Sequence, residues 1–247
     1  IMLGRMELAK LEIYAKNANK VQETVLKSLM KKNKNTVYGK KNNFADVHSY
    51  EDYKKLVPLT NYYDYDEYVQ RMANGEKNLN TAAFVRRFTE SSGSTGKSKL
   101  VPLSAWAEWV CQCFSFSAPV GCAYKYFKSQ GKKMPPQKGL LTAEVNCRKL
   151  DSGKTVSCLS SIPLLNIKPV VPFIGTSPKE LQFADGNLDY DSHYLKLLFA
   201  LQHRNVSYLG TIFITTLESM FFYLEENWEM ICDDIEKGVI NSSIRCP

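Results

Sequence analysis

The sequence predicts an α/β fold, because segments with helical periodicity alternate with short apolar segments typical of strands. Helical spacing of apolar residues is clearest over Met6–Lys32 and Asp189–His203. Two apolar segments flank a stretch rich in serine, glycine and lysine near residue 95, as two strands joined by a loop would. The chain has 247 residues with an apolar fraction of 44%, which is enough to form a sizeable core.

The first third of the chain is predicted to be mainly helical. Asn33-Lys34-Asn35 is turn-like and should stop the first helix, and residues 38–44 resemble a loop. Ser49 can cap a short helix that Pro58 closes, and Asn74-Gly75 can end the next helix. The helices expected here are Met6–Lys32, a short helix after Ser49 that runs to Leu56, and Tyr62–Ala73.

The middle of the chain should form a β-hairpin followed by a long helix. The short connection between Phe84–Thr89 and Leu100–Leu103 favours antiparallel pairing over a strand-to-helix turn. Ser104 can cap a helix from Ala105 to about Lys128, and Pro119 should kink or split it.

The last part of the chain alternates between strands and helices. Prolines between Ser160 and Ser177 should break regular structure, and Asp151–Lys154 is a turn signal. Ser177 is expected to cap the helix that begins at Pro178. The strands expected are Lys138–Val145, Cys147–Leu150, Thr155–Leu159 and Val206–Leu209, and the helices are Pro178–Phe183, Asp189–His203, Thr215–Leu224 and Asn227–Glu236.

Composition argues against several classes of function. The net charge is +7, but the lysine clusters are short and lack interleaved arginines, so we expect a solvated surface and not a nucleic-acid site. Seven scattered cysteines without C-x-x-C, together with three histidines, give no zinc spacing, so no metal site is expected. The cysteine usage and the lack of a signal-like N-terminus predict a reduced, cytoplasmic protein. The longest apolar stretch, Val206–Leu224, contains Glu218 and hydroxyl residues, so no membrane span is expected.

The stretch Ser91–Lys99 has the composition of a phosphate-binding loop. Glycines allow close approach of a ligand, while backbone amides, hydroxyls and lysines supply donors and positive charge. One candidate is the P-loop of nucleotide triphosphatases, whose end Gly96-Lys97-Ser98 fits. That motif requires glycine where Ser91 stands and a helix next, whereas Val101-Pro102 follows, so the match is poor. A serine- and glycine-rich solvent loop is a further alternative.

The second candidate is the pattern [ST]-[ST]-G-[ST]-T-G-x-x-K, which Ser91–Lys99 matches at every fixed position. This stretch resembles the ATP-binding loop of the adenylate-forming superfamily, which includes acyl-CoA ligases, luciferases and peptide-synthetase adenylation domains. That superfamily also places the loop between two strands.

Further segments resemble the auxin-responsive Gretchen Hagen family of acyl acid–amido synthetases. The resemblance extends from about residue 35 to the end, although the phosphate loop is one residue shorter than in the common plant form. The segments are Tyr50–Tyr53, Val57–Thr60, Tyr68 with Arg71 and Gly75-Glu76, Thr176–Pro178, Tyr194–Val206 and Tyr223–Gly238.

The resemblance implies a fold and a domain organisation. Residues 1–247 would be the incomplete N-terminal portion of the large domain of an adenylate-forming enzyme, a mixed sheet with flanking helices. A leading helix would occupy residues 1–34, and the strand–phosphate loop–strand unit residues 84–103. The C-terminal half and the small mobile domain would be absent, and with them the residues that hold adenine, ribose and metal.

The resemblance also implies a two-step reaction. A carboxylate attacks the α-phosphorus of ATP to give an acyl-adenylate and pyrophosphate, and an amino acid then attacks the acyl carbon and releases AMP. Mg²⁺ is expected with ATP. This fragment is expected to be inactive without its missing C-terminal half. An acyl-CoA ligase-type enzyme, or a non-catalytic fragment that binds a partner, remain the alternatives.

Roles follow for individual residues. Lys99 is the expected catalytic residue, since it would neutralise charge on the departing pyrophosphate. His193 and His203 are expected to be structural. Candidates for the acid pocket are Trp109, Cys113 and Thr211, each of which could equally be ordinary core. The expected ATP-binding residues are Ser91, Ser92, Gly93, Ser94, Thr95, Gly96 and Lys99.

Overall fold

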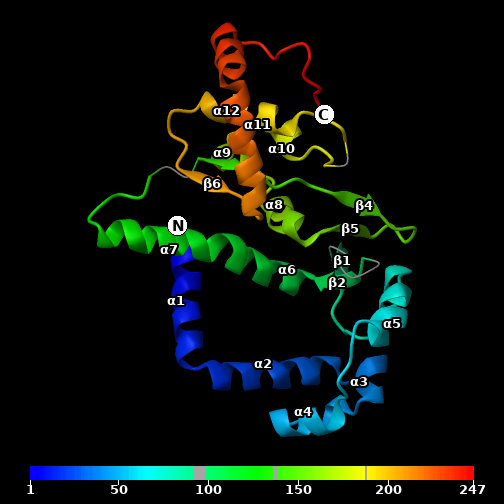
Figure 1. Cartoon of the computed structure of the whole chain (residues 1–247). Helices are drawn as coiled ribbons and strands as arrows, with labels where there is room; N and C mark the ends of the chain where they lie inside the picture. The colour runs from blue at the N-terminus through cyan, green and yellow to red at the C-terminus, as the bar shows by residue number, and fades with distance from the viewer. Residues whose placement is uncertain (92–97, 136–137, 187) are drawn as a thin grey trace. The chain divides into compact units, whose positions relative to one another are not determined.

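The computed structural model describes residues 1–91, 98–135, 138–186 and 188–247 (Figure 1). It divides into two compact units. The first unit comprises Ile1–Ser129 and Arg148–Ser157, and the second comprises Gln130–Cys147 and Cys158–Pro247. Antiparallel and parallel strand pairs both occur, with helices around them, which confirms the mixed α/β class.

The helices of the first unit follow its sequence signals in most places. Ser49 caps α4 by accepting a hydrogen bond from the backbone of Asp52 at 3.1 Å, as predicted. The helical elements are α1 (Met2–Lys16), α2 (Ala18–Asn33), α3 (Val37–Lys41), the 3₁₀ turn η1 (Phe44–Asp46), α4 (Tyr50–Leu56), α5 (Tyr63–Ala73), α6 (Ala105–Gln112), the π-helical turn η2 (Cys113–Ser117) and α7 (Ala118–Ser129).

Two predictions for this region were wrong. The single helix over Met6–Lys32 is two helices that meet at Asn17, where φ −124° and ψ 32° leave the helical range. The side chain of Asn17 donates to the Ile13 carbonyl at 2.9 Å, the local competition that makes asparagine favour helix ends. Residues 38–44 are also helical in part, because Thr36 caps α3 by accepting from the backbone of Gly39 at 2.9 Å.

A four-stranded sheet forms the centre of the first unit, in the order β2-β1-β5-β4. Its strands are β1 (Val85–Glu90), β2 (Leu100–Ser104), β4 (Cys147–Lys149) and β5 (Thr155–Cys158). The predicted hairpin is confirmed, since β1 and β2 pair antiparallel with Glu90 opposite Leu100. Phe88 of β1 and Val156 of β5 are fully buried and anchor the hairpin in the core of this unit.

The long helix after the hairpin is split, as its proline predicts. The hydroxyl of Ser104 accepts from the backbone of Ala107 at 3.2 Å and caps α6. The π-helical turn η2 then separates α6 from α7, whose second residue is Pro119. Proline lacks the N–H that a regular helix needs, and a π turn lets the helix continue past it.

The second unit combines a parallel strand pair with short and long helices. Strand β3 (Gly139–Leu141) lies beside β6 (Tyr208–Gly210), and α11 (Ser192–Leu201) packs against α12 (Ile214–Lys237). Tyr194 is fully buried between these helices and donates to Asp234 Oδ2 at 2.5 Å. The remaining elements are the 3₁₀ turn η3 (Leu159–Ser161), α8 (Ile162–Asn166), α9 (Val171–Ile174) and α10 (Lys179–Gln182).

Three expectations for this unit need correction. Residues Thr215–Leu224 and Asn227–Glu236 form one helix, α12, because nothing in between interrupts its hydrogen bonding. The hydroxyl of Ser177 makes no capping hydrogen bond to α10. The proline-rich region 160–177 contains two short helices, α8 and α9, each with a proline in its first turn.

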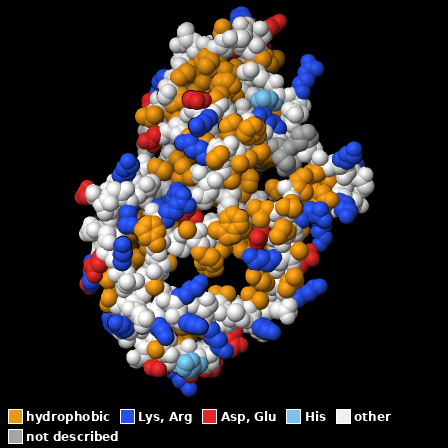
Figure 2. Space-filling view, turned by 180° about the vertical axis from the view of Figure 1, so that it is seen from behind, with side chains coloured by type: hydrophobic (Ala, Val, Ile, Leu, Met, Phe, Trp, Pro, Cys, Tyr) orange, Lys and Arg blue, Asp and Glu red, His pale blue; other side chains and the backbone are white. Residues whose placement is uncertain are grey.

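On the face that Figure 2 shows, the charged side chains are dispersed. Lysine and arginine side chains are spread over the face that Figure 2 shows and do not gather in one patch there. None of the helices in the described parts of the chain combines the length and apolar character that a membrane crossing requires.

Candidate functional site

The ends of the Ser91–Lys99 stretch are joined to each other in the first unit. The backbone N–H of Ser91 donates to the Lys99 carbonyl at 3.0 Å, and the Lys99 N–H donates to the Ser91 hydroxyl at 3.0 Å. Residues 92–97, which include Ser92, Gly93, Ser94, Thr95 and Gly96, lie outside the described residues. The hairpin therefore fixes where this stretch leaves β1 and where it enters β2.

Lys99 is half-buried beside two tyrosines. Its Nζ atom lies 5.5 Å from the ring centroid of Tyr62 and 5.7 Å from that of Tyr63. These distances are within the range of cation–π attraction. The structure thus places a cation at the end of the serine- and glycine-rich stretch, held against aromatic faces.

The three residues expected in an acid pocket lie in different surroundings. Trp109, on α6 of the first unit, is 50% exposed. Cys113, at the start of η2, is buried, and burial followed by the charge of Glu7 raises the pKa of its thiol. Thr211 belongs to the second unit, where it lines a cavity.

The cavity of the second unit has a volume of about 730 Å³. Its wall contains one carboxylate, one ammonium, one imidazole and several hydroxyls, together with the apolar side chains of Ile212, Phe213 and Met220. It is lined by Thr142, Ala143, Glu144, Asn146, Cys158, Ser160, Ser192, His193, Lys196, Thr211, Ile212, Phe213, Thr215, Thr216, Ser219 and Met220. Such a mixture suits a small molecule with both apolar and polar groups.

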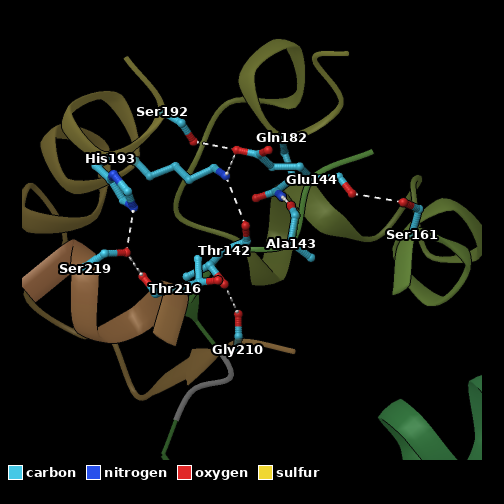
Figure 3. A network of polar contacts seen from close by, with 11 residues as sticks. Thr142, Ala143, Glu144, Ser161, Gln182, Ser192, His193, Gly210, Thr216 and Ser219 are labelled. Carbon is cyan, nitrogen blue, oxygen red and sulfur yellow. Dashed lines mark hydrogen bonds and ion pairs between the residues drawn. The ribbon is translucent and has the colours of Figure 1, made fainter. Parts of the chain in front are cut away.

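A buried lysine organises one side of this cavity, and Figure 3 labels its partners Thr142 and Glu144 together with Ser192. Lys196, on α11, is only 2% exposed, and its Nζ donates to the Thr142 carbonyl at 3.1 Å and to Glu144 Oε1 at 3.2 Å. The hydroxyl of Ser192 donates to the same Glu144 oxygen at 2.7 Å. The ammonium thus donates hydrogen bonds to acceptors of the protein and is almost inaccessible to solvent.

Burial and this ion pair shift the pKa values of the cavity wall. Burial lowers the pKa of Lys196, while the Glu144 carboxylate opposes the shift. Burial alone would raise the pKa of Glu144, but the Lys196 charge and the Ser192 hydrogen bond outweigh it, and the pKa is lowered. Burial, and then the Lys196 charge, lower the pKa of His193, whose Nε2 lies 3.4 Å from the Ser219 hydroxyl. At neutral pH the wall holds an ionised Glu144 and a neutral His193.

The segment after β3 is fixed by hydrogen bonds on both sides. Thr142 donates from its backbone N–H to the Gly210 carbonyl at 2.9 Å. Gln182 donates to the Ala143 carbonyl at 2.9 Å, and Ser161 donates to the Glu144 carbonyl at 3.0 Å. Each residue from Thr142 to Glu144 therefore has a fixed backbone, which orients the Glu144 side chain.

The ion pair of this cavity was missed at the level of sequence. Lys196 stands within a helix whose neighbours Leu195 and Leu197 are both buried. A lysine flanked on both sides by leucines is the signal that could have identified it, but lysines in helices are usually solvated. Glu144 lies in an apolar segment predicted to be strand, and β3 ends before it.

The family comparison matches nearly the whole chain. The model of the "GH3 family N-terminal domain" matches residues 7–247. The Arabidopsis thaliana protein designated GH3.9 is 30% identical, with 97% of this chain and 41% of the relative covered. Indole-3-acetic acid-amido synthetase GH3.8 of rice (Oryza sativa subsp. indica) is 28% identical, with coverages of 94% and 38%.

Solved structures agree with the sequence matches. The structure titled "GH3.15 acyl acid amido synthetase" superposes with a TM-score of 0.81 at 26% identity. The superposition covers 97% of this chain and 42% of that protein. The chain thus spans about two-fifths of the length of the relatives that it matches.

Proposed function

The chain belongs to the GH3 family, the family that its sequence motifs resemble, and we propose that it is the N-terminal part of an acyl acid–amido synthetase. Such an enzyme activates a carboxylic acid with ATP and joins it to an amino acid. The relatives named as indole-3-acetic acid-amido synthetases and as an acyl acid amido synthetase support this proposal. Cytoplasmic location belongs to the same proposal.

The observation that carries the proposal is the hairpin that joins Ser91 to Lys99. The strand–loop–strand arrangement brings the first and last fixed residues of the ATP-loop pattern within hydrogen-bonding distance of each other. ATP is the substrate, and the cationic Lys99 is suited to the charge of its phosphates. In the part of the chain that the structure describes, no three His, Cys, Asp or Glu side chains gather to hold a metal. We propose that Mg²⁺ accompanies ATP, because this ion is usually bound through substrate phosphates together with a few carboxylates.

We propose the cavity of the second unit as the place for the acid. Thr211 lines it together with the apolar side chains of Ile212 and Phe213, which provide a surface for the body of an organic acid. Lys196 is closed to the carboxylate of the substrate because its hydrogen bonds go to Thr142 and Glu144. Trp109 and Cys113 belong to the first unit and do not line this cavity.

We further propose that the region which follows this one in the relatives packs on α12. Ile214, Phe221 and Trp228 recur at intervals of seven residues on that helix and are 72%, 47% and 54% exposed. Exposed apolar side chains in a row usually mark an interface. The relatives contain more than half of their length beyond the matched part, which is ample polypeptide to cover this row.

The test is ATP–pyrophosphate exchange with a panel of carboxylic acids. It uses this chain and, separately, the polypeptide encoded when the reading frame continues beyond Pro247. We expect acid-dependent exchange in the longer polypeptide and none in the chain alone. AMP release that requires an amino acid identifies an amido synthetase, whereas release that requires coenzyme A identifies an acyl-CoA ligase. A longer polypeptide without any acid-dependent exchange would leave the chain a non-catalytic binding module.

A further inference from the structure

A tyrosine side chain forms hydrogen bonds to the outer edge of β2. In the sheet order β2-β1-β5-β4, β2 is an edge strand, so alternate backbone groups face away from β1. The hydroxyl of Tyr62 forms hydrogen bonds with both outward-facing groups of Leu100, its N–H and its carbonyl. It accepts from the Leu100 N–H at 3.1 Å and donates to the Leu100 carbonyl at 3.2 Å. One side chain thus replaces the missing neighbouring strand at the residue that follows Lys99.

The same tyrosine supports the side chain of Lys99. The ammonium lies 5.5 Å from the centroid of its ring, and the ring of Tyr63 meets that of Tyr62 edge-on at 6.1 Å. Tyr62 is partly buried, and burial raises the pKa of its hydroxyl, with a contribution from nearby Asp66. The hydroxyl therefore stays protonated at neutral pH and can keep donating to Leu100.

We propose that Tyr62 is a positioning residue for Lys99 in the reaction with ATP, an inference that rests on the proposed function. Its hydroxyl fixes the backbone of Leu100, the first residue of β2 and the one directly after Lys99, and its ring contacts the ammonium. A ring face contacts an ammonium from one side and leaves N–H donors on the other side for phosphate oxygens. A lysine held in this way loses less side-chain freedom when ATP binds.

The first test measures catalysis in the polypeptide that shows exchange. Tyr62→Leu removes ring and hydroxyl, and we expect the KM for ATP to rise about 5-fold or more while the KM for the acid stays unchanged. Tyr62→Phe keeps the ring and should recover part of this loss. A merely structural role would instead lower the active fraction, and hence kcat, with the KM for ATP unchanged.

A double-mutant cycle shows whether Tyr62 acts through Lys99. In a Lys99→Ala background, Tyr62→Leu should have almost no further effect on the KM for ATP, because its target is absent. The matched control is Tyr50→Leu, since Tyr50 lies under Lys54 at 5.3 Å in the same kind of contact on α4, away from the hairpin. Tyr50→Leu should leave the KM for ATP at the wild-type value.

The second test does not depend on activity. Lysines of this chain are converted to ¹³C-dimethyl-lysine, and the NMR resonance of Lys99 is identified by its loss in Lys99→Arg. We expect a ring-current shift of this resonance that decreases in Tyr62→Leu, where only the ring of Tyr63 remains, and that persists in Tyr62→Phe.

The two tests separate the failure of the inference from that of the proposed function. Without any exchange, the proposed function falls, and the role of Tyr62 in the reaction falls with it. With exchange present, an unchanged KM for ATP in Tyr62→Leu overturns the inference alone. A lower KM also overturns it, because the rings would then compete with ATP for the ammonium.

Discussion

The two lysines Lys99 and Lys196 show how burial assigns different tasks to the same residue type. Lys99 is half-buried and lies over aromatic faces, which attract its charge without consuming its hydrogen-bond donors. Lys196 is 2% exposed and donates to Thr142 and Glu144. Lys99 can therefore bind an incoming anion, whereas Lys196 can only stabilise the cavity wall of which it is part.

Substitution of Lys99 should reduce adenylation. We expect Lys99→Ala to lower the rate of ATP–pyrophosphate exchange of the longer polypeptide by about 100-fold, because one preorganised group facing the developing charge is lost. Lys99→Arg keeps the positive charge and should retain more of the rate. Unchanged exchange in Lys99→Ala would remove this residue from the mechanism.

The Glu144–Lys196 ion pair should contribute to stability in a pH-dependent way. Glu144→Gln leaves the buried ammonium without its counter-charge, so we expect a loss of about 2 kcal/mol in the free energy of unfolding near neutral pH. Fully buried pairs lose about 3–5 kcal/mol on such a change, but the side chain of Glu144 is 37% exposed. Urea unfolding followed by circular dichroism measures the difference.

The sign of the pH dependence follows from the lowered pKa of Glu144. Its ordinary value is 4.5, and the folded protein binds this proton less tightly than the unfolded chain does. The stabilisation is therefore complete above pH 4.5 and is lost as the pH falls through the folded pKa. The stability difference between wild type and Glu144→Gln should shrink below pH 4.5. A double variant, Glu144→Gln with Lys196→Met, should be more stable than Glu144→Gln alone, since no unpaired charge is left.

The sequence alone identified Lys99 as a candidate, whereas the roles of Lys196 and Glu144 became visible only in the structure. The pattern of Ser91–Lys99 identified candidate residues because their types and their order are specific. The hairpin that flanks them is confirmed. Lys196 and Glu144 could not be found in this way, because their pairing depends on two segments about fifty positions apart in the chain. Charge alone does not show that a lysine is buried.

At the scale of elements, local signals predicted the hairpin and the caps other than that of Ser177 better than they predicted the lengths of helices. The hairpin β1–β2 and the caps Ser49 and Ser104 depend on neighbouring residues only, and all are confirmed. The break at Asn17 and the continuity of α12 depend on competition between weak preferences and tertiary packing. Such outcomes are not contained in a local pattern.

The contact between α1 and α7 gives a prediction at this scale. A Cβ atom at Gly121 would lie 2.2 Å from the Gly4 carbonyl oxygen, and one at Gly4 would lie 2.4 Å from the Ser117 carbonyl oxygen. Alanine favours a helix by about 1 kcal/mol over glycine, so Gly121→Ala would stabilise an isolated helix. Here the clash with backbone should prevail and destabilise the first unit by about 1–2 kcal/mol.

Limited proteolysis and denaturant unfolding measure this effect. In Gly121→Ala we expect faster cleavage of α1, since α1 has to move away from α7. The control Ser28→Ala, on the exposed side of α2, should be neutral or slightly stabilising. A Gly121→Ala protein as stable and as resistant as wild type would contradict the close packing of the two helices.

At the scale of the molecule, the family and the fold class could be predicted, but the division into two units could not. The motifs from residue 35 onward identified the family, which the match over residues 7–247 confirms. The sequence around the boundaries at Ser129 and Cys147 does not have the composition of a typical linker, so the boundaries could not be recognised from it. Ser91 and Lys99 belong to the first unit, and the residues that line the cavity belong to the second.

The row Ile214, Phe221 and Trp228 on α12 yields the last prediction. If the region beyond Pro247 packs there, Trp228 should be less accessible to acrylamide in the longer polypeptide than in this chain, where it is 54% exposed. Its signal is obtained by difference from Trp228→Phe. Phe221→Glu should destabilise the longer polypeptide by about 2 kcal/mol, because a charge would be buried without a partner, yet change this chain by less than about 0.5 kcal/mol. Glu236→Gln, near the end of the same helix, should affect neither. Equal quenching of Trp228 in both proteins would show that another surface receives the rest of the polypeptide, since the burial of that side chain is what the proposal requires.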